Sequence, residues 1–185
     1  MGRRHEVLDG AIEVLGTLGL RGLTHRAVDS TAGVPAGTTS NYFRSRAALV
    51  RGVVDRMVEE DLAFWAAFDG VEESTPGEVA ERLAEFVRWS IGAGRVRGVA
   101  RLNLFAAASV EPDLREPLRR GRRAVEEVGE KIGAAIGLGI TESALVMDAT
   151  DALITRQLAM PTDGYDPMPA LLVLLTRLRR GSPIG

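Results

Sequence analysis

Apolar residues recur at intervals of three and four along most of this chain, the spacing that places them on one face of an α-helix. Glycines, prolines and polar clusters interrupt the pattern and divide it into segments. No segment alternates apolar and polar residues in the manner of a strand, so the sequence predicts no sheet. It predicts an all-α fold of about nine helices, at residues 4–18, 24–32, 35–41, 45–68, 77–92, 97–109, 113–136, 142–160 and 167–180.

The first three segments carry start and stop signals. Gly19 follows the first segment where a left-handed residue would end a helix, and Thr24 is a natural N-cap for the second. Gly33 ends the second segment, and Pro35 suits the first turn of the third. Two short helices joined by a glycine-containing turn are typical of a helix-turn-helix, which the sequence therefore predicts in its first third.

Composition narrows the classes of function. The 185 residues are 45% apolar and include no cysteine, which excludes disulfide scaffolds, thiol catalysis and Cys-ligated zinc. The longest apolar runs are far shorter than the ~20 residues that cross a bilayer, and the first 15 residues lack a secretory apolar centre. We therefore expect a soluble, cytoplasmic protein with no membrane partner.

Charge is divided unevenly along the chain. The net charge is -2, from 23 basic and 25 acidic residues. Residues 1–56 hold eight arginines and five acidic residues, a balance of +3, so the remainder carries -5. This asymmetry favours contact between the first third and a polyanion, although a difference of a few charges also arises by chance.

The string 23–46 has the chemistry of a DNA-reading element. Ala36 and Gly37 leave room for close approach to a groove, and Asn41 can serve an adenine. Three hydroxyls at 38–40 and that of Tyr42 can reach phosphates or base edges. Phe43 is better interpreted as a core residue, a plug that packs this helix onto the rest of the domain. Arginines at 44 and 46 add cationic contacts, with an ordinary solvated pair as the alternative.

The order and spacing of these residues over 6–56 resemble the TetR family of bacterial transcriptional repressors. The pieces that carry the resemblance are Gly19, Leu23-Thr24, Ala32-Gly33-Val34, Gly37 and the exit Tyr42-Phe43-Arg44-Ser45-Arg46-Ala47-Ala48-Leu49. The resemblance implies a supporting helix that starts at 24–26, a recognition helix at 36–42, and a phosphate contact near the start of the next helix. The implied contacts with double-stranded operator DNA are Thr24, His25, Arg26, Ala36, Gly37, Thr38, Ser40, Asn41, Tyr42 and Arg46.

Two residues depart from the family pattern. The family commonly has a large apolar residue at position 39 and an aromatic residue at position 41, where this chain has Thr39 and Asn41. A hydroxyl thus stands where a core contact is usual, and the amide can shift base preference. For His25 the alternative to a DNA contact is a solvated side chain without a function, because a lone histidine near a helix start is more often solvated than functional.

The sequence predicts two functional parts: a helix-turn-helix domain at 1–47 and a C-terminal ligand-binding and dimerisation domain at 48–185, joined by the helix at 45–68. The polar stretch 69–77 is the best candidate for a boundary between subdomains. Proteins similar to this one bind an inducer among their C-terminal helices, so we expect a largely apolar small molecule here. Candidate pocket residues, for which core packing is the alternative, are Trp65, Phe86, Trp89, Asn103, Phe105, Met147 and Gln157.

The last two predicted helices are suited to dimerisation. Small residues in 142–160 allow close helix approach, and 167–180 is rich in leucine. Two such helices from each of two chains would make a four-helix bundle, as in proteins that resemble this one, with an internal core contact as the alternative. The predicted homodimer interface comprises Leu145, Ala149, Ala152, Leu153, Leu171, Leu174, Leu175 and Leu178.

Other features favour no second function. Five arginines between 115 and 123 precede glutamates one to two turns later, which is typical of a salt-bridged exposed face; a second nucleic-acid surface or an anion clamp is the alternative. The glycine-rich spots at 92–94 and 137–139 follow no predicted strand, and no nucleophile with a base partner stands out. We therefore expect no enzyme, cofactor or metal site.

These observations predict a homodimeric repressor that a small-molecule ligand releases from its operator. The alternative is a helical small-molecule-binding protein, with or without catalysis, whose DNA-binding head is vestigial.

Overall fold

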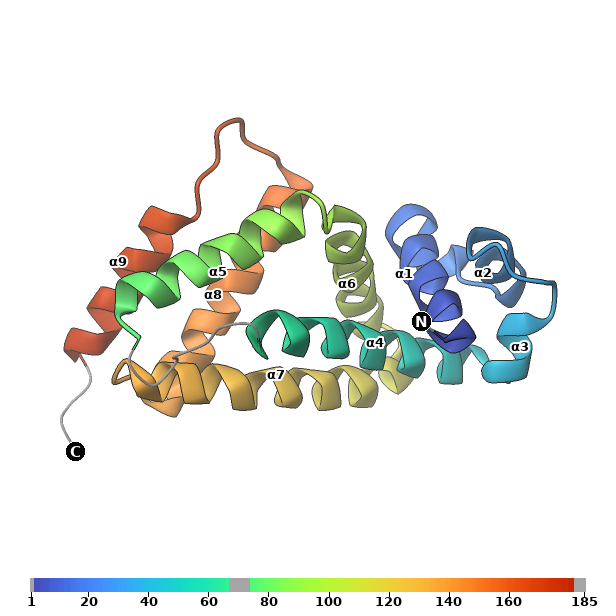
Figure 1. The fold of residues 1–185 in the computed structure, drawn as a ribbon, viewed down its shortest axis with the longest axis horizontal. Helices are drawn as coiled ribbons and strands as arrows, with labels where there is room; N and C mark the ends of the chain where they lie inside the picture. Colours follow the sequence, from blue (N-terminus) through green and yellow to red (C-terminus); the bar gives the residue numbers. More distant parts are fainter. Residues whose placement is uncertain (1, 67–73, 182–185) are drawn as a thin grey trace. The chain divides into compact units, whose positions relative to one another are not determined.

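The computed structural model describes residues 2–66 and 74–181. Within them the chain forms nine α-helices, one short 3-10 helix and no strand, which confirms the predicted all-α fold (Figure 1). The elements are α1 (Arg3–Gly22), α2 (His25–Thr31), α3 (Thr38–Tyr42), α4 (Arg46–Ala66), α5 (Pro76–Ile91), α6 (Arg95–Ala108), η2 (Pro112–Leu114), α7 (Arg115–Ala135), α8 (Ile140–Ala159) and α9 (Met168–Gly181).

The start and stop signals act largely as predicted. Gly19 has a φ of 69° and breaks the helical geometry of α1, after which one further turn leads to Gly22. The Thr24 hydroxyl accepts a hydrogen bond from the Ala27 N–H at 3.1 Å, and Gly33 has a φ of 63°. The predicted end of the fourth helix at residue 68, and most of the predicted boundary 69–77, lie outside the described residues.

The third helix differs from its prediction. Pro35 and Ala36 lie before the helix, which begins only at Thr38 and ends at Tyr42. Gly37 is the N-cap residue, and its φ of 89° is left-handed, a conformation that a residue with a Cβ adopts only at a cost. The prediction that Pro35 occupies the first turn was therefore wrong, because the chain turns at Gly37 before it can begin to coil.

The chain divides into two compact units. Unit 1 comprises residues up to Asp61 together with Gly94–Arg122, and unit 2 comprises Leu62–Ala93 and the residues from Arg123 onward. Unit 1 thus holds α1 to α3, most of α4, α6, η2 and the beginning of α7. It extends beyond the predicted functional head at 1–47 because α6 returns to pack against α1.

The core of unit 1 lies where α1, α4 and α6 meet. Leu8, Leu15, Leu49 and Leu104 are almost fully buried there. Gly16 of α1 faces the start of α6 so closely that a Cβ would lie 2.2 Å from a backbone carbonyl oxygen. Only a glycine permits this approach, so α6 is packed directly against the backbone of α1.

Unit 2 is built around α5, which contacts both α8 and α9 (Figure 1). Thr75 and Glu78 form a capping box at the start of α5: the Thr75 N–H donates to the Glu78 carboxylate at 2.7 Å, and the Glu78 N–H donates to the Thr75 hydroxyl at 3.3 Å. Leu171 and Leu175 of α9 are fully buried inside the single chain. Their assignment to the dimer interface was wrong, since they have no surface left for a partner.

Among the described residues, no single helix is long and apolar enough to cross a membrane. One helix pair, Pro112–Ala135 with Ile140–Ala159, passes the same test of length and composition, but it is bent by 117°.

Candidate functional site

A buried carboxylate holds the turn and the first residues of α3 in place. Asp29, at the end of α2, accepts hydrogen bonds from the Gly37 N–H at 2.7 Å, the Thr39 N–H at 2.7 Å and the Thr39 hydroxyl at 2.5 Å. Asp29 is 5% exposed and Thr39 is fully buried. The carboxylate therefore caps a helix whose own N-cap residue, Gly37, has no side chain.

The environment of Asp29 keeps its carboxyl ionised. Burial raises the pKa of Asp29, but hydrogen bonds from the Thr39 side chain, the Thr39 N–H and the Gly37 N–H lower it, as does the charge of His25. The lowering effects prevail, so the pKa of Asp29 lies below its ordinary value. A charged acceptor bound by three donors makes this turn rigid.

Asp29 also explains the departure from the family pattern at position 39. The Thr39 side chain occupies a core position, and its hydroxyl is satisfied by Asp29 rather than left without a partner. Asp29 was not predicted from the sequence, because its carboxylate acts 8 and 10 residues ahead in the chain. The only local signal was an acidic residue on the otherwise apolar face of α2.

The structure places most of the predicted DNA contacts on the surface of unit 1. Thr24, Arg26, Ala36, Gly37, Ser40, Asn41, Tyr42 and Arg46 are exposed, and His25 and Thr38 are half-buried. The Thr38 hydroxyl donates to the Pro35 carbonyl at 2.6 Å, and the Ser40 hydroxyl donates to the Gly37 carbonyl at 2.8 Å. These two hydroxyls must rotate before they can donate to a phosphate.

Three exposed side chains among the predicted DNA contacts are free to donate. Arg26, Asn41 and Tyr42 have no hydrogen-bond or ion-pair partner among the described residues. Phe43, the next residue, is 5% exposed and packs into the core, which confirms its predicted role as a plug. Because Phe43 is anchored, α3 presents Asn41 and Tyr42 outward.

Arg46 begins α4 and has partners within the chain. Its Nη1 lies 3.1 Å from the Glu111 Oε2, and its Nη2 donates to the Leu20 carbonyl at 3.3 Å. Glu111 lies 65 residues further along the chain, in the turn after α6. The sequence predicts a basic contact at Arg46, but only the fold brings a carboxylate to it.

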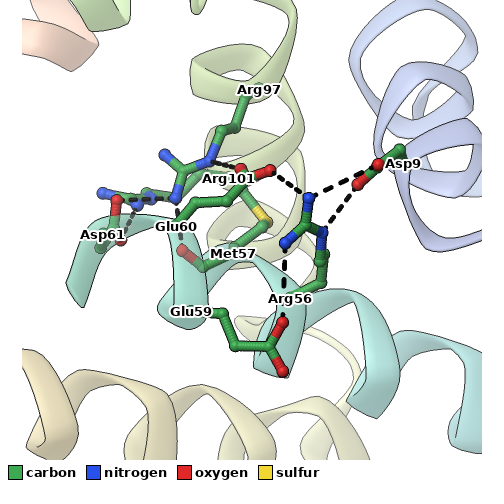
Figure 2. A network of polar contacts seen from close by, with 8 residues as sticks. All are labelled: Asp9, Arg56, Met57, Glu59, Glu60, Asp61, Arg97 and Arg101. Atoms are coloured by element: carbon green, nitrogen blue, oxygen red, sulfur yellow. Dashed lines mark hydrogen bonds and ion pairs between the residues drawn. The ribbon is translucent and has the colours of Figure 1, made fainter. Parts of the chain in front are cut away.

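A chain of charged residues ties α6 and α1 to α4 (Figure 2). Arg97 of α6 donates to the Asp61 carboxylate at 2.6 Å and to the Glu60 carboxylate at 2.8 Å, and it also donates to the Met57 carbonyl. Arg101, one turn further along α6, donates to the other oxygen of Asp61. Asp61 and Arg97 are both buried.

The same network continues toward α1 through Arg56. Its Nε donates to the Asp9 carboxylate at 2.8 Å, and its Nη2 lies 3.1 Å from Glu60 (Figure 2). Burial lowers the pKa of Arg97, while the neighbouring carboxylates of Asp61 and Glu60 act in the opposite direction. Charges bound on several sides in this way fix the C-terminal part of α4 against its neighbours.

Unit 2 contains a continuous cluster of four aromatic rings. Centroid distances are 5.2 Å for Phe64 and Trp65, 5.2 Å for Phe64 and Phe86, 5.8 Å for Trp65 and Phe86, and 6.1 Å for Phe86 and Trp89. The guanidinium of Arg82 stacks 4.1 Å from the centre of the Phe64 ring. Three of the predicted pocket residues thus come together, and Phe64 is a member that was not predicted from the sequence.

Of the other four predicted pocket residues, Met147 and Gln157 belong to unit 2, and Asn103 and Phe105 belong to unit 1. Met147 packs on Gly129 of α7, and Gln157 is 5% exposed, with its Nε2 donating to the Thr162 carbonyl at 3.0 Å. The Oε1 of Gln157 is buried and has no hydrogen-bond partner in the described part of the chain. Asn103 and Phe105 lie in unit 1, where the Asn103 amide donates to a carbonyl of α1 at 2.8 Å and Phe105 is 44% exposed.

The helices α8 and α9 leave apolar side chains on the surface of unit 2. Leu145 is 48% exposed, and Ala152 is also exposed. Leu172 and Val173, which were not predicted as interface residues, are 37% and 61% exposed. The remaining predicted interface residues, Ala149, Leu153, Leu174 and Leu178, are half-buried.

Two arginines of the basic run in α7 have partners other than the predicted glutamates. Arg120 lies 2.8 Å from Asp55 of α4, and Arg115 donates to the carbonyls of Ala108 and Ser109 at 2.9 and 3.2 Å.

In residues 2–66 and 74–181, no three histidine, cysteine, aspartate or glutamate side chains form a metal-binding group.

Comparisons with known proteins agree with this geometry. Residues 74–181 match the family model for the tetracyclin repressor-like C-terminal domain. The multidrug binding protein EbrR, solved with ethidium, is 27% identical with a TM-score of 0.74, and the match covers 96% of this chain and 98% of that one.

A TetR-family member from Streptomyces coelicolor A3 is 29% identical with a TM-score of 0.78, over 96% of this chain and 98% of that one. A transcriptional regulator from Rhodococcus sp. Rha1 shares the fold over the full length of both chains, with a TM-score of 0.77 at 19% identity. None of the curated proteins matches the sequence.

Proposed function

Because the chain belongs to the TetR family of transcriptional regulators, we propose that it is a homodimeric repressor that binds operator DNA through unit 1. A small molecule bound among the helices of unit 2 releases it from the DNA. We infer no catalytic activity, since members of this family act as regulators.

The observation that carries the DNA-binding part of the proposal is the way Asp29 presents α3. Its carboxylate fixes the turn at Gly37, and Phe43 anchors the other end, so Asn41 and Tyr42 are held outward. Arg26 lies exposed at the start of α2. A rigid backbone with free donors on one face is suited to phosphates and base edges in a major groove.

The support for a ligand comes from unit 2. EbrR has been solved with ethidium, malachite green and proflavin, which are aromatic cations. The four-ring cluster of this chain offers stacking surfaces for a largely apolar, aromatic molecule. A ligand that prefers the DNA-incompetent arrangement by ~1–3 kcal/mol would lower the DNA affinity by roughly 5- to 150-fold.

The support for a dimer is the apolar surface of α8 and α9, with Leu145 and Val173 exposed. A second copy of this chain would cover these side chains through a four-helix contact. A twofold pair would also place two recognition helices on half-sites about 34 Å or a multiple of that distance apart.

Duplex DNA from the neighbouring intergenic region, titrated at several salt concentrations, tests the proposal. Tight binding with a steep salt dependence is expected. Arg26→Gln should weaken binding and reduce the slope of log affinity against log salt by about 0.9 for each phosphate that is no longer neutralised. Arg177→Gln, which removes an exposed charge from α9, is the matched control and should leave the slope unchanged.

The rival proposal, a small-molecule-binding protein with a vestigial head, makes the opposite prediction. It requires quenching of Trp65 and Trp89 fluorescence by proflavin without any binding of duplex DNA. Salt-independent DNA binding, or equal losses of affinity from Arg26→Gln and Arg177→Gln, would also exclude the proposed contact surface.

A further inference from the structure

The side chain of Arg46 is engaged within the protein at the place where a DNA phosphate contact is expected. Its guanidinium lies 3.1 Å from the Glu111 carboxylate, and the two side chains are 46% and 43% exposed. A carboxylate and a phosphodiester are both anionic acceptors that a guanidinium binds with charged hydrogen bonds. Glu111 thus occupies the kind of contact that Arg46 would make with DNA.

Glu111 is held in its position by the backbone around it. Its N–H donates to the Ala107 carbonyl at 2.8 Å, and its own carbonyl accepts from the Leu114 N–H at 3.1 Å. Arg115 closes the same turn by donating to the carbonyls of Ala108 and Ser109. The carboxylate is therefore presented by a structured turn at the end of α6.

The other contacts of α6 determine where that turn lies within unit 1. The start of α6 packs on the backbone of α1 at Gly16, and Arg97 binds Asp61 of α4 at 2.6 Å (Figure 2). Arg46 is itself held to α1 through the Leu20 carbonyl. Any rearrangement that shifts α6 along α1 or α4 would therefore change how closely Glu111 approaches Arg46.

We propose that Glu111 competes with DNA phosphate for Arg46, so that the position of α6 regulates how many phosphates each head can bind. The proposal rests on the proposed function, because it requires that unit 1 bind duplex DNA. With Glu111 on Arg46, the head binds DNA less tightly. With the carboxylate withdrawn, Arg46 is released to make one further phosphate contact.

Glu111→Gln tests the competition, because glutamine keeps the size and removes the charge. We expect the affinity for duplex DNA to rise roughly two- to fivefold per head, the range that an exposed ion pair of this kind supports. The slope of log affinity against log salt should become steeper by about 0.9 per head, as one more phosphate is neutralised. The melting temperatures of the variant and the wild type are compared as well, because a difference between them would show that the substitution also changed the stability of the fold.

Two controls separate competition from a general loss of negative charge. Asp113→Asn removes an exposed carboxylate two residues away in the same turn and should leave affinity and slope nearly unchanged. In an Arg46→Gln background, Glu111→Gln should have no further effect, because the guanidinium for which carboxylate and phosphate compete is gone.

Unchanged or lower DNA affinity of Glu111→Gln, with wild-type protein that binds DNA, would overturn the competition and leave the proposed function intact. An equal gain in the Arg46→Gln background would overturn it as well. If neither the wild type nor Glu111→Gln binds duplex DNA at low salt, the proposed function itself fails. Binding by Glu111→Gln alone would support the competition strongly.

Discussion

The two compact units bury different kinds of polar residue. Among the described residues, the buried charged side chains are Asp29, Asp61 and Arg97, and all three belong to unit 1. The buried polar residues of unit 2 are uncharged: Ser90, Ser143, Thr150 and Gln157. In unit 1 the charges join separate helices, whereas the hydroxyls of Ser143 and Thr150 donate to carbonyls one turn earlier, at 2.9 and 2.8 Å.

This difference matches what each unit is proposed to do. A buried ion pair is satisfied in one geometry and is strongly unfavourable in others, so it holds helices in a defined arrangement. Ring contacts and van der Waals packing tolerate displacement more gradually. In the proposed function, unit 1 holds a recognition surface rigidly and unit 2 accommodates a ligand, and the internal chemistry of each unit suits that role.

The largest expected effect lies in the ring cluster of unit 2. Phe86 is 5% exposed and contacts three other rings, so Phe86→Ala should destabilise unit 2 by about 4 kcal/mol. Trp65 and Trp89, both in unit 2, are the only tryptophans, so urea titration followed by their fluorescence measures this loss directly. Phe105→Ala, at a 44% exposed site in unit 1, is the control; its loss, followed by circular dichroism, should be less than about 1 kcal/mol.

An equal loss of stability from both phenylalanine variants would show that the cluster is no better packed than the surface.

The next effect tests the buried charges of unit 1. Asp61→Ala leaves Arg97 buried with one carboxylate fewer and should destabilise unit 1 by about 3 kcal/mol. Far-ultraviolet circular dichroism should then show a helical transition at lower urea concentration than the tryptophan transition. Replacing the pair together, as Asp61→Leu with Arg97→Met, should recover most of the loss, because both buried charges are removed and Arg101, which also donates to Asp61, is only half-buried.

A destabilisation below about 1 kcal/mol for Asp61→Ala would mean that water reaches Arg97 in the variant. Coincident transitions by both methods would mean that the two units unfold together, and the comparison between them would then apply to packing alone.

The sequence predicted the elements of unit 1 because their signals are local. Thr24 caps the helix that it begins, and Gly19 and Gly33 take the left-handed conformations expected from glycine at helix ends. Phe43 was predicted as a core residue from its place after the recognition helix. Each of these assignments depends on neighbours within a few positions, which a sequence displays directly.

The contacts that join distant parts of the chain were not predictable in the same way. Asp61 and Arg97 are 36 residues apart, and Arg46 and Glu111 are 65 apart. Opposite charges are common on helical surfaces, so no pattern distinguishes these pairs from solvated ones. In unit 2 the leucine spacing of α9 predicted a helix, but only packing decides that Leu171 is buried while Leu172 is 37% exposed.

The smallest of the three effects concerns Asp29, which links the buried charges of unit 1 to its recognition surface. Asp29→Asn keeps an acceptor of the same size but loses the charge that three donors bind, and should cost about 2 kcal/mol at neutral pH. Ser30→Ala, at the exposed neighbouring position, should cost nothing measurable. Urea titration followed by circular dichroism measures both.

The contribution of Asp29 to folding stability depends on pH, and the direction of its pKa shift gives the sign of that dependence. Because the pKa of Asp29 is lower in the folded than in the unfolded chain, its contribution is fully present above the unfolded pKa. It is lost as the pH falls from about 5 through the lowered folded pKa. Asp29→Asn should therefore match the wild type more closely in acid than at neutral pH. A stability gap that stays constant with pH would mean that the charge of Asp29 is not what holds the recognition helix, and that shape alone fixes the turn at Gly37.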